Sequence, residues 1–201
     1  MSTIVLQTLG WVIFGVSTIT IGVWLRRNPS KKDAENASRI LHFLFWVTVA
    51  PPMALGVFYP GLSHYDHLLG LSPLPRYAIL RIVRIFKILI GTYLILVANT
   101  SLWVFGRGAN AFLLTRQLVV TNIYEWTRNP MSLGVYLGSI GSGLLMRSTY
   151  MTSSALLVLI PAHIFYLKYF EEKELELRMG PFFLEYKRRV PFLLPRLFPR
   201  N

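Results

Sequence analysis

The sequence contains no cysteine among its 201 residues. A disulfide framework, a cysteine-ligated zinc site, a thiol nucleophile and an iron–sulfur cluster are therefore excluded. Acidic residues are also scarce, because 9 Asp and Glu stand against 21 Lys and Arg, for a formal net charge of +12. Only 15% of the residues are charged and 53% are hydrophobic, with a mean hydropathy of +0.47. This apolar surface excludes intrinsic disorder and favours one domain that lies in a membrane.

An excess of basic residues is typical of proteins that bind nucleic acid or an anionic membrane surface. The high hydropathy favours the membrane, and the sequence contains no recognisable nucleic-acid-binding module. We therefore expect membrane lipids as partners of the chain and no nucleic acid.

Long runs without charged residues predict the membrane spans. Residues 1–25, 40–65, 88–106, 129–146 and 148–167 contain no Lys, Arg, Asp or Glu. A spanning helix needs about 20 mostly apolar residues, and its backbone must be helical because lipid offers no hydrogen-bond partners. We predict an all-α fold: a polytopic integral membrane protein with about five transmembrane helices and a cytosolic C-terminal helical cap.

The basic residues between these runs predict the orientation of the chain. Several Lys and Arg lie in residues 26–39, in residues 107–128 and in the tail from Lys168 onward. The positive-inside rule places these three segments in the cytosol and the N-terminus outside. A stripe of Arg81, Arg84 and Lys87 falls on the other side, and we interpret residues 76–87 as an interfacial amphipathic segment.

Glycine and proline mark special points in the predicted spans. Gly134 and Gly138 have the GxxxG spacing that lets two helices approach closely, although a ligand role for them stays open. Pro161 should kink the last span, and Pro51-Pro52 should kink or break the second. The short connection of residues 147–149 predicts an antiparallel hairpin of the last two spans.

Two polar clusters contain the candidate functional residues. Glu171 and Glu172 lie where the last span should leave the bilayer, an expensive place for adjacent carboxylates. The alternative is a solvated first turn of a cytosolic helix, which the i,i+4 pair of Glu174 and Arg178 favours. Residues 122–134 form the second cluster, which is either an interfacial aromatic belt or a helix start that binds an anion.

The two clusters belong to one series of motifs in residues 115–196. The motifs read, in order, Arg128-Asn129-Pro130-Met131 with Gly134, Glu171-Glu172-x-x-Leu175, Gly180, Tyr186, Val190-Pro191 and Pro195. In order and spacing, the series resembles the superfamily of the isoprenylcysteine carboxyl methyltransferases and phospholipid methyltransferases. Family members have His at the position of Asn129 and Tyr at the position of Ser132. Asn129-Pro130-Met131 is more similar to the phospholipid branch and the block from Tyr186 to Pro191 to the prenylcysteine branch, so the branch stays open.

The resemblance implies an S-adenosylmethionine site at the cytosolic face and no metal. An acceptor carboxylate would be oriented by Arg128 or Lys168, whereas Glu172 would hold an amine or take its proton. Such a transfer depends on alignment and on desolvation of the acceptor. The residues implied in binding the methyl donor are Arg116, Gln117, Leu118, Val119, Tyr124, Asn129, Pro130, Met131, Ser132 and Glu171.

The expected function is S-adenosylmethionine-dependent methyl transfer to a lipid-like or prenylated acceptor, such as a prenylcysteine-type carboxylate. One alternative is N-methylation of a phospholipid amine. Others are a non-catalytic membrane scaffold with a degenerate site, which the departures at Asn129 and Ser132 leave open, and a membrane reductase with a nicotinamide cofactor. Residues 1–114 should form the N-terminal transmembrane helices and residues 115–201 the methyltransferase-like region.

Overall fold

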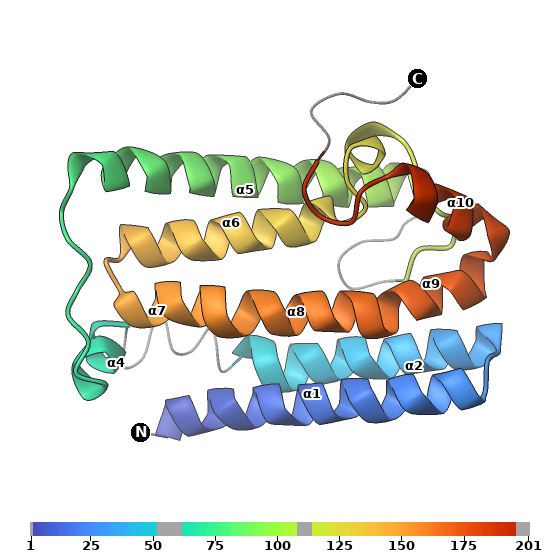
Figure 1. The fold of residues 1–201 in the computed structure, drawn as a ribbon, viewed down its shortest axis with the longest axis horizontal. Coiled ribbons are helices and arrows are strands. Elements are labelled where there is room, and N and C mark those ends of the chain that lie inside the picture. The colour runs from blue at the N-terminus through green and yellow to red at the C-terminus, as the bar shows by residue number, and fades with distance from the viewer. Residues whose placement is uncertain (1, 52–61, 108–113, 196–201) are drawn as a thin grey trace. The chain divides into compact units, whose positions relative to one another are not determined.

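The computed structural model describes residues 2–51, 62–107 and 114–195 (Figure 1). Helices and connecting loops make up these ranges and no strand occurs in them, so the all-α prediction is confirmed for this part of the chain. The chain divides into two compact units. The first unit contains residues 1–73 and 148–178, and the second contains residues 74–147 and 179–201.

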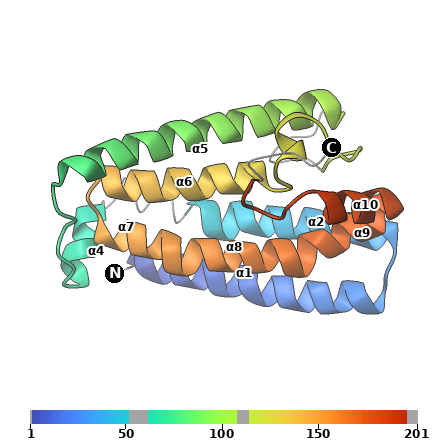
Figure 2. The ribbon, with the colours of Figure 1, turned by 45° about the horizontal axis from the view of Figure 1, so that its top comes forward.

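The first unit is built on long helices that pack lengthwise (Figures 1 and 2). Ser30 caps α2 by accepting a hydrogen bond from the backbone N–H of Asp33, which also lies favourably in the first turn. Helix α1 contacts α2, α8 and the π turns η1 and η5. The elements are α1 (Ser2–Arg27), α2 (Lys31–Leu44), η1 (Phe45–Val49), α4 (Leu62–Leu68), α7 (Thr149–Ser154), η4 (Ala155–Leu159), α8 (Ile160–Tyr166), η5 (Leu167–Glu171) and α9 (Glu172–Met179).

The second unit contains α5 (Ala78–Phe105), the 3-10 turn η3 (Asn122–Glu125), α6 (Pro130–Leu145) and α10 (Pro181–Arg189). Helices α5 and α6 lie side by side (Figures 1 and 2). A Cβ atom on Gly134 would lie 2.7 Å from the carbonyl oxygen of Gly91, and a Cβ atom on Gly91 would lie 2.8 Å from the nitrogen of Gly138. The GxxxG segment therefore serves helix packing, the first of its two interpretations.

Two helical runs, Ile4–Arg27 and Thr149–Met179, are long and apolar enough to cross a membrane. Only 17% and 22% of their most apolar windows are buried, whereas the core helix of a soluble protein is mostly buried. Large apolar side chains such as Val12 and Val16 are instead exposed along α1, which suits contact with lipid. The five spans and their orientation stay predictions.

The proline and loop predictions meet different outcomes. Pro161 lies in the first turn of α8, directly after the π turn η4, so the helix is irregular there but continues. Pro51 is still helical, while Pro52 lies outside the described residues. Residues 78–87 of the expected interfacial segment 76–87 form the first part of α5. Residues 147–149 connect helices of different units, and the hairpin stays a prediction.

Candidate functional site

In the second unit, the loop that leads into α6 is hydrogen-bonded to the C-terminal segment, residues 190–193. The bonds come from residues 127–129 of the loop. The hydroxyl of Thr127 donates a hydrogen bond to the carbonyl of Leu193 at 2.8 Å. The side-chain amide of Asn129 donates to the carbonyl of Phe192, also at 2.8 Å. Asn129 stands at the N-cap of α6, but its side chain does not cap that helix. The amide of Asn129 therefore joins the loop to residues 190–193.

Arg128 contributes to the same attachment. Its backbone N–H donates to the carbonyl of Pro191 at 2.9 Å, and its Nε donates to the carbonyl of Val190 at 3.1 Å. Its guanidinium also lies 5.6 Å from the ring centroid of Phe192. These contacts favour a structural role for Arg128. Its expected role in orienting an acceptor carboxylate stays a prediction.

Tyr186 of α10 holds the middle of the loop. Its hydroxyl donates a hydrogen bond to the backbone carbonyl of Tyr124 at 2.7 Å. Burial raises the pKa of Tyr186 well above its usual value, and the smaller effect of Arg128 opposes this shift. The phenol therefore keeps its proton, and its ability to donate, throughout the physiological pH range.

We expect Tyr186→Phe to loosen the loop. The substitution removes the hydrogen bond that the Tyr186 hydroxyl donates to the carbonyl of Tyr124, which should lower the free energy of unfolding by about 0.5–1.5 kcal/mol. Thermal unfolding in detergent, followed by circular dichroism, measures this loss. Tyr93→Phe is the matched control because Tyr93 is exposed in the same unit. An equal change in both variants would contradict the assigned role.

The remaining residues implied in donor binding around the loop differ in accessibility. Arg116 and Gln117 are exposed and Leu118 is half-buried. Val119 and Tyr124 lie in a hydrophobic cluster together with Ala98, and the side chain of Tyr124 is only 8% exposed. Packing of this kind favours a structural role for Val119 and Tyr124 and leaves little ring surface for stacking on a cofactor.

Helix α6 begins at Pro130, as the sequence predicts. Proline is suited to the first helical position because its fixed φ matches the helix and no N–H is needed there. Pro130 is buried, whereas Met131 and Ser132 are half-buried in the first turn. The N–H groups of a first turn are suited to bind a carboxylate.

In the first unit, the candidate carboxylates lie at the junction of two helical elements. Glu171 is the last residue of the π turn η5, and Glu172 is the first residue of α9. Both side chains are half-buried, while Lys168 of the same turn is exposed. Turns of the π type are rare and occur often at functional sites.

The predicted pair of Glu174 and Arg178 is present, but it is not solvated. The Arg178 Nε atom contacts the Glu174 Oε1 atom, and Glu174 is only 1% exposed. The alternative of a solvated first turn therefore does not hold for Glu174. Among the described residues, no group of His, Asp and Glu could hold a metal ion.

The comparisons with known proteins agree with the series of motifs. The sequence profile of the family described as phospholipid methyltransferase matches residues 80–178. A protein of Bradyrhizobium diazoefficiens named methanethiol S-methyltransferase 2 is 35% identical over 81 residues, which are 39% of this chain. The chain thus matches only 29% of the length of that relative. No solved structure is detectably similar to the chain.

These matches confirm the resemblance to the integral membrane methyltransferases. The matched segment contains α6 and the Glu171–Glu172 pair. It ends before residues 190–193, whose carbonyls accept the hydrogen bonds of Arg128 and Asn129. The roles of individual residues in binding stay predictions. Sequence reasoning missed the attachment of the loop through the carbonyls of residues 190–193, because backbone acceptors leave no signal in the residue types.

Proposed function

Because residues 80–178 are related to the phospholipid methyltransferases, we propose that this chain is an integral membrane enzyme that transfers a methyl group from S-adenosylmethionine to a lipid-like acceptor. One observation carries the proposal. The matched segment contains both the start of α6, with Pro130, and the Glu171–Glu172 pair. The activity of the whole enzyme is part of the proposal, since the chain matches a minor part of its relative.

Each unit, taken by itself, contains groups suited to bind the donor, which supplies a methyl group on a positively charged sulfur. The first turn of α6 offers backbone N–H groups for its carboxylate, near Met131 and Ser132. The carboxylate of Glu171 is suited to accept hydrogen bonds from ribose hydroxyls. Exposed Arg116 and Gln117 are free of core packing and can contribute further contacts.

On the acceptor side, we assign Lys168 and Glu172 to the head of the lipid. The exposed ammonium of Lys168 would attract an acceptor carboxylate. For an amine, Glu172 would hold the ammonium or take its proton. In either case a lone pair of the acceptor forms the new bond to carbon. The electrons of the broken carbon–sulfur bond stay on sulfur, and an amine releases its extra proton.

A second acceptor class has one observation in its favour. The relative from Bradyrhizobium diazoefficiens is named for the methylation of methanethiol, a small thiol. A thiol acceptor would form a carbon–sulfur bond and lose its proton, for which Glu172 is again the candidate base. We therefore treat the small thiol as the rival of the lipid-like acceptor.

A panel of acceptors tests the function directly. Purified protein in detergent is incubated with methyl-labelled S-adenosylmethionine and with a prenylcysteine analogue, phosphatidylethanolamine or methanethiol. We expect label in one of the two lipid-like acceptors. Label in methanethiol alone would contradict the lipid-like acceptor and keep the methyltransferase. No label in any acceptor, with no binding of the donor, would favour the non-catalytic scaffold.

Two substitutions then distinguish the acceptor head groups. If the acceptor is a carboxylate, Lys168→Ala should raise its KM. If it is an amine, Glu172→Gln should lower kcat by about 10²–10⁴-fold, the usual contribution of a positioned base. Lys187→Ala, a change in α10, is the control for loss of a positive charge. If Lys168→Ala and Glu172→Gln both leave the kinetics unchanged, neither residue belongs to the acceptor site.

A further inference from the structure

The π turn η5 (Leu167–Glu171) lies immediately before Glu172 in the chain. The N–H of Glu172 donates to the carbonyl of Leu167, five residues earlier. A π-type bond spans one residue more than an α-helical bond, so inserting a π turn leaves a backbone carbonyl without its usual partner in the helix. A stable π turn therefore benefits from a donor outside its own helix.

Arg26, near the C-terminal end of α1, supplies such a donor. Its Nη2 atom donates to the backbone carbonyl of Tyr169, in the middle of the π turn. Its Nη1 atom donates to the carbonyl of Gly22 at 2.9 Å. The planar guanidinium thus bridges α1 and the π turn, which the single ammonium of a lysine reproduces poorly.

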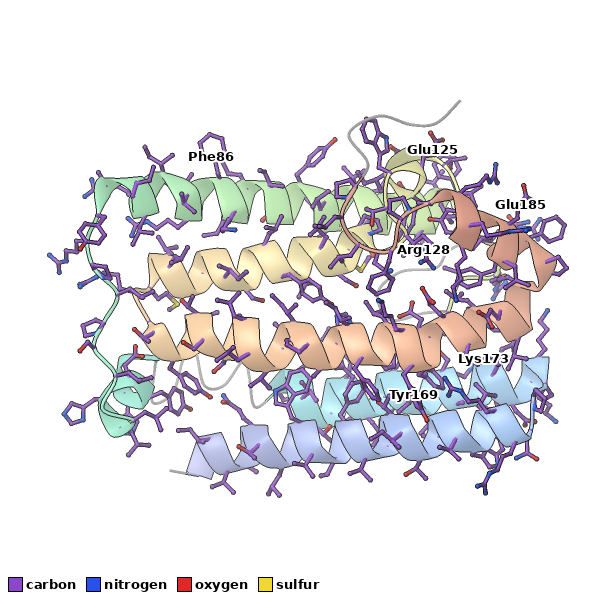
Figure 3. The ribbon with its side chains drawn as sticks, in the orientation of Figure 1. Phe86, Glu125, Arg128, Tyr169, Lys173 and Glu185 are labelled. Atoms are coloured by element: carbon purple, nitrogen blue, oxygen red, sulfur yellow. The ribbon has the colours of Figure 1, made fainter. Side chains whose placement is uncertain are left out.

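The ring of Tyr169 completes the contact. The Arg26 guanidinium carbon lies 4.1 Å from the centroid of this ring, within the range of a cation–π interaction. Figure 3 shows Tyr169 on the side of its helix that faces α1. The ring of Phe165 stacks on the same tyrosine, with centroids 5.0 Å apart and planes at 12°.

The ring of Tyr169 packs closely on α1 at Gly22, where no side chain fills the space. A Cβ atom at position 22 would lie 2.5 Å from the Tyr169 Cε1 atom and 3.2 Å from the Arg26 Nη1 atom. Any side chain there would displace the ring or the guanidinium. Gly15, earlier on the same helix, has open space around it.

We propose that Arg26 and Gly22 clamp Tyr169 and thereby position the carboxylates of Glu171 and Glu172. The clamp fixes the π turn at its middle, two residues before Glu171. Since the direction of both carboxylates depends on the register of this turn, Arg26 is a positioning residue for the transfer. This inference rests on the proposed function of the Glu171–Glu172 pair.

The test compares Arg26→Gln and Arg26→Lys with Arg27→Gln. Arg27 is the matched control because it is exposed at the next position of α1. Hydrogen–deuterium exchange of the backbone amides 168–172 reports on the turn itself and requires no activity. Calorimetric titration with S-adenosylhomocysteine and steady-state kinetics with the labelled donor report on the carboxylates.

In Arg26→Gln we expect amide exchange at 168–172 to be about 5–10-fold faster and the affinity for S-adenosylhomocysteine about 5–10-fold weaker, because the lost hydrogen bond is exposed to solvent. The KM for the donor should rise, while the KM for the acceptor should change less. Arg26→Lys should recover part of the loss, and Arg27→Gln should behave as wild type.

Unchanged exchange in Arg26→Gln overturns the clamp, whatever the activity of the protein. Faster exchange with unchanged affinity and kinetics overturns the positioning of the carboxylates. If wild-type protein binds no S-adenosylhomocysteine and transfers no methyl group, the proposed function fails. The positioning fails with it, and the exchange data still decide whether Arg26 holds the π turn.

Discussion

Glu171→Ala should weaken the binding of S-adenosylhomocysteine by about 10–100-fold. Its carboxylate is assigned to hydrogen bonds with the donor, and loss of one charge-assisted bond costs about 1.5–3 kcal/mol. Because Glu171 is only half-buried at the end of the π turn, its removal should leave the fold intact. Calorimetric titration in detergent measures the affinity, and circular dichroism checks the helix content.

Glu185→Ala is the control for this experiment. Glu185 lies on α10, where it forms an exposed ion pair with Arg189 at 3.6 Å. Exposed ion pairs of this kind contribute little to stability. Glu185→Ala therefore shows the effect on affinity of removing a carboxylate outside the candidate site. Affinity that is unchanged in Glu171→Ala, or reduced equally in both variants, would exclude Glu171 from the donor site.

Gly134→Ala should have the largest effect on stability. The added Cβ atom would lie 2.7 Å from the carbonyl oxygen of Gly91 and 3.1 Å from the backbone nitrogen of Ile95. Helix α6 must therefore move away from α5, and we expect unfolding free energy to fall by about 3 kcal/mol, the upper part of the range for overpacked sites. The thermal midpoint in detergent should fall accordingly.

Gly138→Ala is a close control for this substitution. A Cβ atom at position 138 has no neighbour within 4 Å, although both glycines lie on α6. Alanine favours helix over glycine by about 1 kcal/mol, so the stability of this variant should stay the same or rise. Equal destabilisation by the two substitutions would show that the close approach of Gly91 and Gly134 does not hold α5 and α6 together.

Local signals in the sequence predict much of the second unit. Pro130 begins a helix because proline is favoured in a first turn, and the order of motifs locates the loop before it. The spacing of Gly134 and Gly138 predicts close packing, but does not identify Gly91 as its partner. That partner comes from α5, and nothing near position 91 in the sequence indicates the contact.

Other features of the candidate site depend on contacts distant in sequence. The spacing of Glu174 and Arg178 predicts their ion pair, but its burial depends on how the whole helical run packs. Arg26 and Tyr169 are 143 residues apart, and the π turn between Leu167 and Glu171 has no signal in the residue types. Sequence therefore identifies the candidate carboxylates without the arrangement that would orient them.

The most direct test of the central claim is photolabelling of the purified protein with methyl-labelled S-adenosylmethionine, followed by peptide mapping. We expect saturable labelling that excess S-adenosylhomocysteine abolishes. The label should lie in residues 116–132, around Glu171, or in both. Absence of saturable labelling would contradict the binding of S-adenosylmethionine, and saturable labelling confined to other parts of the chain would contradict the assigned donor residues.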